Sequence, residues 1–174
     1  MRVIFCAAAA LLAGGCSTAG AGTFSPAGPP SQVSAQVPGQ VPAQAATRAD
    51  LRAGILQAYR DYHRVFELTV ATNRLDEVDQ VATGRIAAHL AALVRDQRRH
   101  RIVERGHAAL NPELVWVKDD TALVVDCVVT GLTRFDARSG RRVGPRAAPR
   151  KILLRSTLKR SGSWRVAELE GAKC

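Results

Sequence analysis

Apolar residues in the first part of the folded region recur at spacings of three and four, which is the period of an α-helix that buries one face. The pattern begins at a capping-box motif formed by Thr47 and Asp50, and Asn73 is a residue type that commonly ends a helix. The apolar stripe between them comprises Leu51, Ile55, Ala58, Tyr62, Val65, Phe66 and Val70. The pattern therefore predicts one long amphipathic helix over residues 47–73.

Two further helical segments are predicted before the period changes. Residues 75–82 predict a short acidic helix or turn, which Gly84 ends. Residues 85–100 predict another helix, whose apolar face comprises Ile86, Leu90, Leu93 and Val94. Its C-terminal end, residues 95–101, is polar on every side, which predicts a solvated segment whose cations suit the helix dipole.

From Ile102 onward the apolar residues alternate with a period of two, which is typical of β-strands. Four strands are predicted, over residues 102–117, 121–133, 151–159 and 163–169. Asn111-Pro112 interrupts the first strand, Ser161-Gly162 forms a tight turn, and a Gly/Pro/Arg-rich loop fills residues 135–150. One face of the second strand carries Ala122, Val124, Asp126 and Val128. Helices followed by an antiparallel meander predict an α+β fold.

The N-terminal end has the pattern of an export signal. Arg2 precedes an uncharged apolar run, and small residues then lead to Cys16. The run is too short to span a bilayer, which takes about 20 residues. Residues 12–16 (LAGGC) resemble the lipobox of bacterial lipoproteins, in which a diacylglycerol is attached to the cysteine thiol and the signal is cut just before it. The resemblance implies a signal peptide over residues 1–15, a lipid anchor on Cys16, and a place on the outer face of the cell membrane.

The stretch after the lipobox has the composition of a tether. Residues 16–46 carry no charged side chain and consist almost wholly of Ala, Gly, Ser, Thr, Pro, Gln and Val. Such a composition cannot bury enough apolar surface to offset the entropy lost on ordering. The sequence therefore predicts a disordered tether over residues 16–46 and a single domain over residues 47–174.

The chain is strongly basic, with a formal net charge of +10. In a cytosolic protein this charge would suggest nucleic acid, but the export signal argues against nucleic acid as a partner. Two explanations stay open. The arginine- and alanine-rich composition can reflect a GC-rich genome, or the charge can attract anionic lipid headgroups or acidic wall polymers.

The four cysteines have different expected roles. Cys6 is expected to be removed with the signal, and Cys16 to be lipidated. Cys127 and Cys174 are the two cysteines left, and an exported protein meets an oxidising compartment in which disulfides persist. Their pairing would close a loop of roughly 50 residues and contribute about 4 kcal/mol. No Cys or His pair stands at metal-ligand spacing, and no phosphate-binding or nucleophile motif is present, so neither metal nor cofactor is expected.

Two short segments carry a resemblance to a known fold. Residues 119–127 (DDTALVVDC) and 162–166 (GSWRV) resemble the third strand and the closing strand of nuclear-transport-factor-2-like domains. The chain also resembles secreted lipoproteins of high-GC Gram-positive bacteria that carry a lipobox, a Pro/Ala tether and a C-terminal cysteine. The resemblance implies a cone in which two to three N-terminal helices pack on a curved antiparallel sheet of about four strands.

Enzymes with that fold place acidic, histidine or tyrosine side chains in the conical pocket, where a buried carboxylate can move protons. The weak candidates here are Asp126, Tyr59, Tyr62, His63 and His107. None matches a catalytic motif. The ordinary interpretations are that Asp126 pairs with an arginine, that His63 is a partly exposed helix residue, and that the tyrosines are core or pocket-mouth aromatics. Trp116 and Trp164 are most simply sheet-packing residues.

These features favour a non-enzymatic binding or interaction module that is displayed on the membrane and meets envelope proteins. One alternative is a small-molecule-binding or enzymatic domain, of dehydratase or isomerase type, that uses the conical pocket. Another alternative is electrostatic attachment to anionic wall polymer or lipid through the arginine-rich loop over residues 138–150. That loop can equally be an ordinary surface loop.

Overall fold

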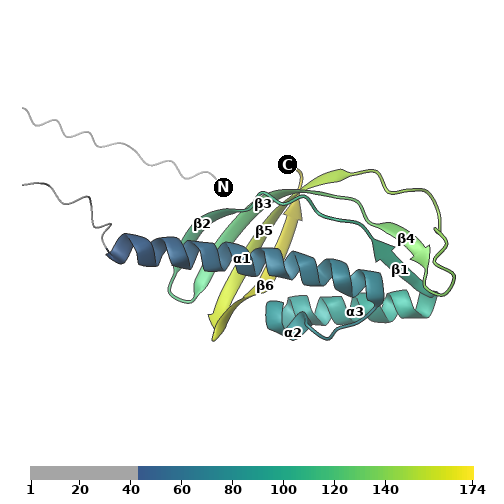
Figure 1. The fold of residues 1–174 in the computed structure, drawn as a ribbon, viewed down its shortest axis with the longest axis horizontal. Helices are drawn as coiled ribbons and strands as arrows, with labels where there is room; N and C mark the ends of the chain where they lie inside the picture. Colours follow the sequence, from purple (N-terminus) through teal and green to yellow (C-terminus); the bar gives the residue numbers. More distant parts are fainter. Residues whose placement is uncertain (1–42) are drawn as a thin grey trace, which may run out of the picture. The chain divides into compact units, whose positions relative to one another are not determined.

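The computed structural model describes residues 43–174, and their side chains from Thr47 onward. Three helices precede six strands, which confirms the α+β class (Figure 1). The helices are α1 (Ala43–Thr72), α2 (Val78–Val81) and α3 (Gly84–His100). The strands are β1 (Ile102–Arg105), β2 (Glu113–Lys118), β3 (Thr121–Thr130), β4 (Thr133–Asp136), β5 (Arg150–Ser161) and β6 (Ser163–Ala172). None of the helices in this range is long and apolar enough to cross a membrane.

The strands form two antiparallel sheets. The larger has the order β2-β3-β5-β6, and β1 pairs with β4 in the smaller. Helix α1 runs across one face of the larger sheet, with α2 and α3 next to it (Figure 1). The core between the helices and the sheet includes Ile55, Tyr59, Leu90, Val124, Leu158 and Val166. In β3 the residues at 122, 124, 126 and 128 are the buried ones, which confirms the predicted alternation.

The ends of α1 show what local sequence does and does not specify. Asn73 adopts a left-handed conformation (φ 58°) and donates its N–H to Thr69 O at 2.8 Å, so the helix stops where the sequence predicts. The start at Thr47 is wrong, because the helix begins at Ala43. Residues 43–46 are Ala, Gln, Ala and Ala, all strong helix formers that extend the helix past the capping motif.

The end of α3 is also less solvated than expected. Gln97 is buried, and Arg98 donates to the backbone carbonyl of Asn73 at the end of α1. The polar C-terminal turn of α3 therefore packs partly against the end of α1 rather than facing water on every side. Arg99 and His100, which are exposed, both interact with Asp96.

The first predicted strand divides in two at its predicted interruption, yet the pairing keeps one register across the break, as far as Leu114. Arg105 pairs with Thr133 in the small sheet, Ala109 bridges Val129, and Glu113 pairs with Val125 in the large sheet. From each of these pairs to the next, both strands advance by four residues, so no residue is inserted on either strand. Residues 102–136 are therefore one long hairpin whose ladder opens around residues 106–112. Part of the loop expected at 135–150 belongs to this hairpin, as the end of β4.

At the opening of the ladder, Gly106 lies directly against the backbone of Gly131. A Cβ atom on Gly106 would overlap the Gly131 carbonyl oxygen. We expect Gly106→Ala to lower the free energy of unfolding by about 1–3 kcal/mol, because backbone on both sides must shift. Gly54→Ala is the matched control: nothing lies within 4 Å of a Cβ there, so a helical alanine should raise stability by about 0.5–1 kcal/mol. Urea unfolding measures both, and equal effects would contradict this interpretation.

Cys127 and Cys174 form a disulfide with their Cα atoms 5.9 Å apart, as the sequence predicts. Cys127 is exposed, because the alternation of β3 points it away from the helices. On that outer face Cys127 pairs with Leu153 of β5, and Leu153 pairs with Ala172 of β6. The bridge therefore ties the end of the chain back across β5 to β3.

The two tryptophans differ in how far they are buried. Trp164 is partly buried against the core and lies under the guanidinium of Arg160, 5.5 Å from its ring centre. Trp116 was predicted to pack on the sheet, but 43% of it is exposed on the edge strand β2. The register shift between Leu114 and Trp116 turns this side chain out of the regular alternation.

Candidate binding pocket

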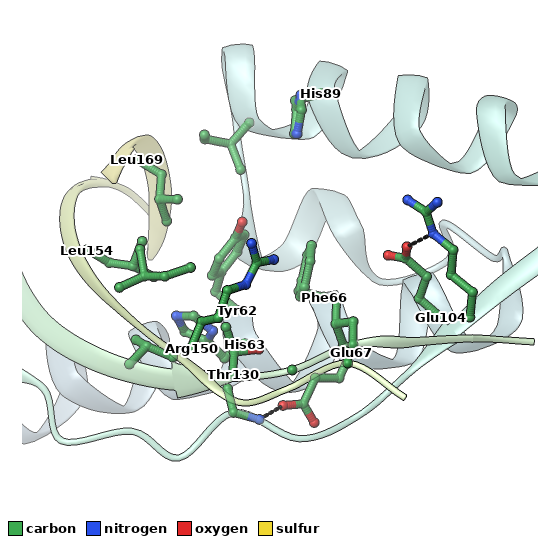
Figure 2. A pocket seen from close by; sticks show the side chains of 18 of the residues that line it. Tyr62, His63, Phe66, Glu67, His89, Glu104, Thr130, Arg150, Leu154 and Leu169 are labelled. Atoms are coloured by element: carbon green, nitrogen blue, oxygen red, sulfur yellow. Dashed lines mark hydrogen bonds and ion pairs between the residues drawn. The ribbon is translucent and has the colours of Figure 1, made fainter. Parts of the chain in front are cut away.

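A pocket of about 940 Å³ opens between α1, α3, the inner face of the large sheet and the segment that leads into β5 (Figure 2). Most of its wall is apolar. The apolar side chains that helices and strands contribute are Phe66, Ile86, Val128, Ile152, Leu154 and Leu169, and Leu132 and Val143 add to them from the connecting segments. The pocket lies where the long hairpin opens, because Ala108, Thr130 and Gly131 also line it.

Helix α1 supplies the polar side of the pocket at consecutive turns. Tyr62, His63 and Glu67 all line it. The rings of Tyr62 and His63 meet edge to face, with centroids 5.3 Å apart. Burial raises the pKa of Tyr62 to about 12 and lowers the pKa of His63, although the negative charges of Asp126 and Glu67 partly oppose the shift of His63. Both side chains are therefore neutral at pH 7.

Both acidic groups of the pocket already have partners. Glu67 accepts the backbone N–H of Ala108 at 2.6 Å and lies 2.9 Å from His107 Nδ1. Glu104 accepts a hydrogen bond from Arg134 Nε at 2.9 Å. These bonds hold the α1 and β1 sides of the pocket against the neighbouring segments.

Two arginines of the pocket are unpaired. Within residues 47–174, neither the Arg85 side chain nor the Arg150 side chain has a hydrogen-bond or ion-pair partner. Arg150 begins β5 on the same face as Ile152 and Leu154, and its side chain lies in the same part of the pocket as Tyr62 and His63 (Figure 2). The free charge of the pocket is therefore positive.

A group of buried polar side chains lies next to this pocket. Tyr59 is fully buried, its hydroxyl lacks a hydrogen-bond partner in the described part of the chain, and its ring lies 4.7 Å from that of His63. Burial, followed by the nearby charge of Asp126, raises the pKa of Tyr59. Ser156 Oγ and His63 Nε2 are likewise buried without a partner among the described residues. The region has more hydrogen-bonding capacity than the described residues use.

The structure corrects three expectations about the candidate residues. Asp126 is buried and accepts the backbone N–H of Asn111, at 3.0 and 3.2 Å from its two oxygens, rather than pairing with an arginine. His63 is only 7% exposed instead of partly exposed. His107 lies after β1 instead of on it, with a side chain that is 95% exposed and does not line the pocket.

Of the five candidates, Tyr62 and His63 line the pocket, whereas Tyr59 and Asp126 lie in the core beside it. Sequence reasoning missed Glu67 and Arg150. Glu67 follows His63 by one helical turn, so the helical period could have found it. Arg150 could have been found from the alternation of Ile152 and Leu154, if the strand predicted over residues 151–159 had begun one residue earlier. Across residues 43–174, no three His, Cys, Asp or Glu side chains lie close enough together to hold a metal ion.

Comparison with known proteins gives a likeness in fold. No family model matches this chain, and no curated protein does. Among solved structures, the chain is similar to the intermembrane space region of the chloroplast protein ARC6, with a TM-score of 0.54 and 14% identity. The likeness covers 78% of this chain and 100% of that one. At this identity it concerns the arrangement of helices and strands alone.

Proposed function

We propose that this protein is a lipid-anchored extracytoplasmic binding protein that holds a small, largely apolar molecule in the pocket between its helices and its sheet. The observation that carries the proposal is the pocket itself. Its volume of about 940 Å³ lies in the range of small-molecule sites, which are mainly apolar with a few placed polar groups. Tyr62, His63 and Arg150 are such groups.

The same arrangement supports a nuclear-transport-factor-2-like cone. Three helices lie against one face of an antiparallel sheet, and the pocket opens between them. The two segments that carry the sequence resemblance, residues 119–127 and 162–166, lie in β3 and β6 with the turns before them.

Binding is favoured over catalysis because the proton-transfer candidates are not assembled in the pocket. The Asp126 carboxylate is occupied by the Asn111 N–H and is not among the lining residues. His63 and His89 both line the pocket, on α1 and α3, whereas His107 does not. The two carboxylates that do line the pocket, Glu67 and Glu104, are already hydrogen-bonded to neighbouring residues, so neither is free to act as a base.

The pocket can be tested with N-phenyl-1-naphthylamine, a neutral apolar dye that fluoresces when bound. We expect the purified protein to bind it, and Leu154→Trp to weaken binding about tenfold by filling the pocket. Leu153→Trp is the matched control, because Leu153 comes directly before Leu154 in β5 and points to the opposite face of the sheet. No binding, or equal loss in both variants when both are folded by circular dichroism, would refute the pocket as a binding site.

The lipid anchor is tested separately. We expect Cys16→Ser to move the protein from the membrane fraction to the soluble fraction and to abolish labelling by an alkyne-tagged fatty acid. Cys6→Ser is the control, because that residue lies inside the signal and should leave both properties unchanged. Continued anchoring of the Cys16→Ser protein would show that the lipid is not on this residue.

A further inference from the structure

The charges that line the pocket specify more than an apolar ligand. Three arginines and two glutamates line it, namely Arg85, Arg134, Arg150, Glu67 and Glu104, which leaves one formal positive charge. Arg134 is hydrogen-bonded to Glu104, and Glu67 is hydrogen-bonded to the backbone of Ala108 and to His107. The cations without partners among the described residues are Arg85 and Arg150.

Of these two cations, Arg150 is the one on the sheet, two residues before Ile152 in the apolar wall of the pocket. It is exposed, and it lines the same pocket as Tyr62 and His63 (Figure 2). A ligand that fills the apolar part of the pocket removes water from this guanidinium. A charge that loses water without gaining a partner destabilises the complex, so the ligand must supply an acceptor.

We propose that the ligand is an amphipathic carboxylate, with its carboxylate bound by Arg150 and its apolar part against Phe66, Ile152 and Leu154. The inference rests on the proposed function of the pocket. A guanidinium presents two parallel N–H donors that match a carboxylate. Glu67 and Glu104 line the same pocket and disfavour a more highly charged head group, such as a phosphate dianion.

His63 supplies a second polar contact for the head group. Its side chain is more than nine-tenths buried, lines the pocket, and leaves Nε2 without a hydrogen-bond partner in the described part of the chain. A neutral imidazole can donate to one carboxylate oxygen while Arg150 binds the other, and because Nε2 is buried in the pocket wall, the ring must turn toward the head group to do so. Arg150 and His63 come from β5 and α1, so the head group would join the sheet to the helix.

The test compares decanoate with methyl decanoate, which has nearly the same apolar chain but no charge, by displacement of N-phenyl-1-naphthylamine. We expect decanoate to bind about tenfold more tightly than the ester, the effect of one charge-assisted pair of hydrogen bonds. Arg150→Gln should remove this preference, so that the acid binds no more tightly than the ester. Arg146→Gln is the control, because Arg146 is an exposed arginine near the pocket that does not line it.

The outcomes separate the two proposals. Equal affinity for acid and ester, or an acid preference that survives Arg150→Gln, would overturn the carboxylate inference while dye binding upholds the pocket. Failure of dye, acid and ester alike to bind would overturn both. A loss of dye binding in Arg150→Gln would show that this arginine supports the fold of the pocket rather than the head group, and would also overturn the inference.

Discussion

Reducing the disulfide between Cys127 and Cys174 is expected to lower the free energy of unfolding by about 4 kcal/mol. The bridge spans 47 residues in sequence and fixes the last residue of the chain. Without it, the unfolded chain gains the entropy of an open loop, and the end of β6 is held by strand pairing alone. For a domain of this size, the loss corresponds to a fall of roughly 15 °C in melting temperature.

The measurement is a thermal melt with and without a phosphine reductant. The Cys127→Ser, Cys174→Ser double variant should melt at the temperature of the reduced protein and be insensitive to the reductant. If the wild-type protein melts at the same temperature in both conditions, the bridge does not contribute to stability.

The second large effect is expected in alkali, where the protein should lose roughly 3 kcal/mol or more as the pH rises from about 10 to 12. Tyr59 and Tyr62 are the two tyrosines of the chain, and both are buried. Burial raises the pKa of Tyr62 from 10.0 to about 12 and shifts Tyr59 in the same direction. The unfolded chain therefore releases these protons first. Stability is fully present below pH 10 and is lost as the pH rises through the folded pKa.

Tyrosinate absorbance at 295 nm, recorded together with circular dichroism, checks this directly. We expect no tyrosinate signal near pH 10 while the protein stays folded, and a signal from both rings when it unfolds. Tyr62→Phe should reduce the alkaline loss of stability, with a single tyrosine then reporting unfolding. A full tyrosinate signal near pH 10 with unchanged circular dichroism would show that both hydroxyls are accessible.

Features that depend on a few neighbouring residues could be predicted from the sequence. Asn73 ends α1, Gly162 takes the positive φ of the last tight turn, and the alternation of β3 places Asp126 and Cys127 on opposite faces. Each follows from a local period or from a residue type with special backbone freedom. The α+β class followed from the order of these periods.

The pocket could be predicted only in part, because it depends on contacts between distant segments. The helical period brought Tyr62 and His63 to the inner face, but nothing near Asp126 in sequence shows that the Asn111 N–H is its partner. That bond exists because the hairpin opens at Asn111 and frees a backbone donor. His107 is carried outward by the same opening. The membrane anchor and the tether stay predictions from residues 1–46.

The shared register of residues 102–114 with residues 124–136 also bears on how this part of the chain can fold. The turn between β2 and β3 closes a very short loop, and hairpins of this kind form in about 1–10 µs. Pairing can then extend outward through Ala109 and Val129 to β1 and β4 without any new loop closure. Joining β5 to β3, by contrast, requires the segment between β4 and β5 to close, which costs further entropy. We therefore expect β1 to β4, which include part of the pocket wall, to pair before β5 and β6 join the sheet.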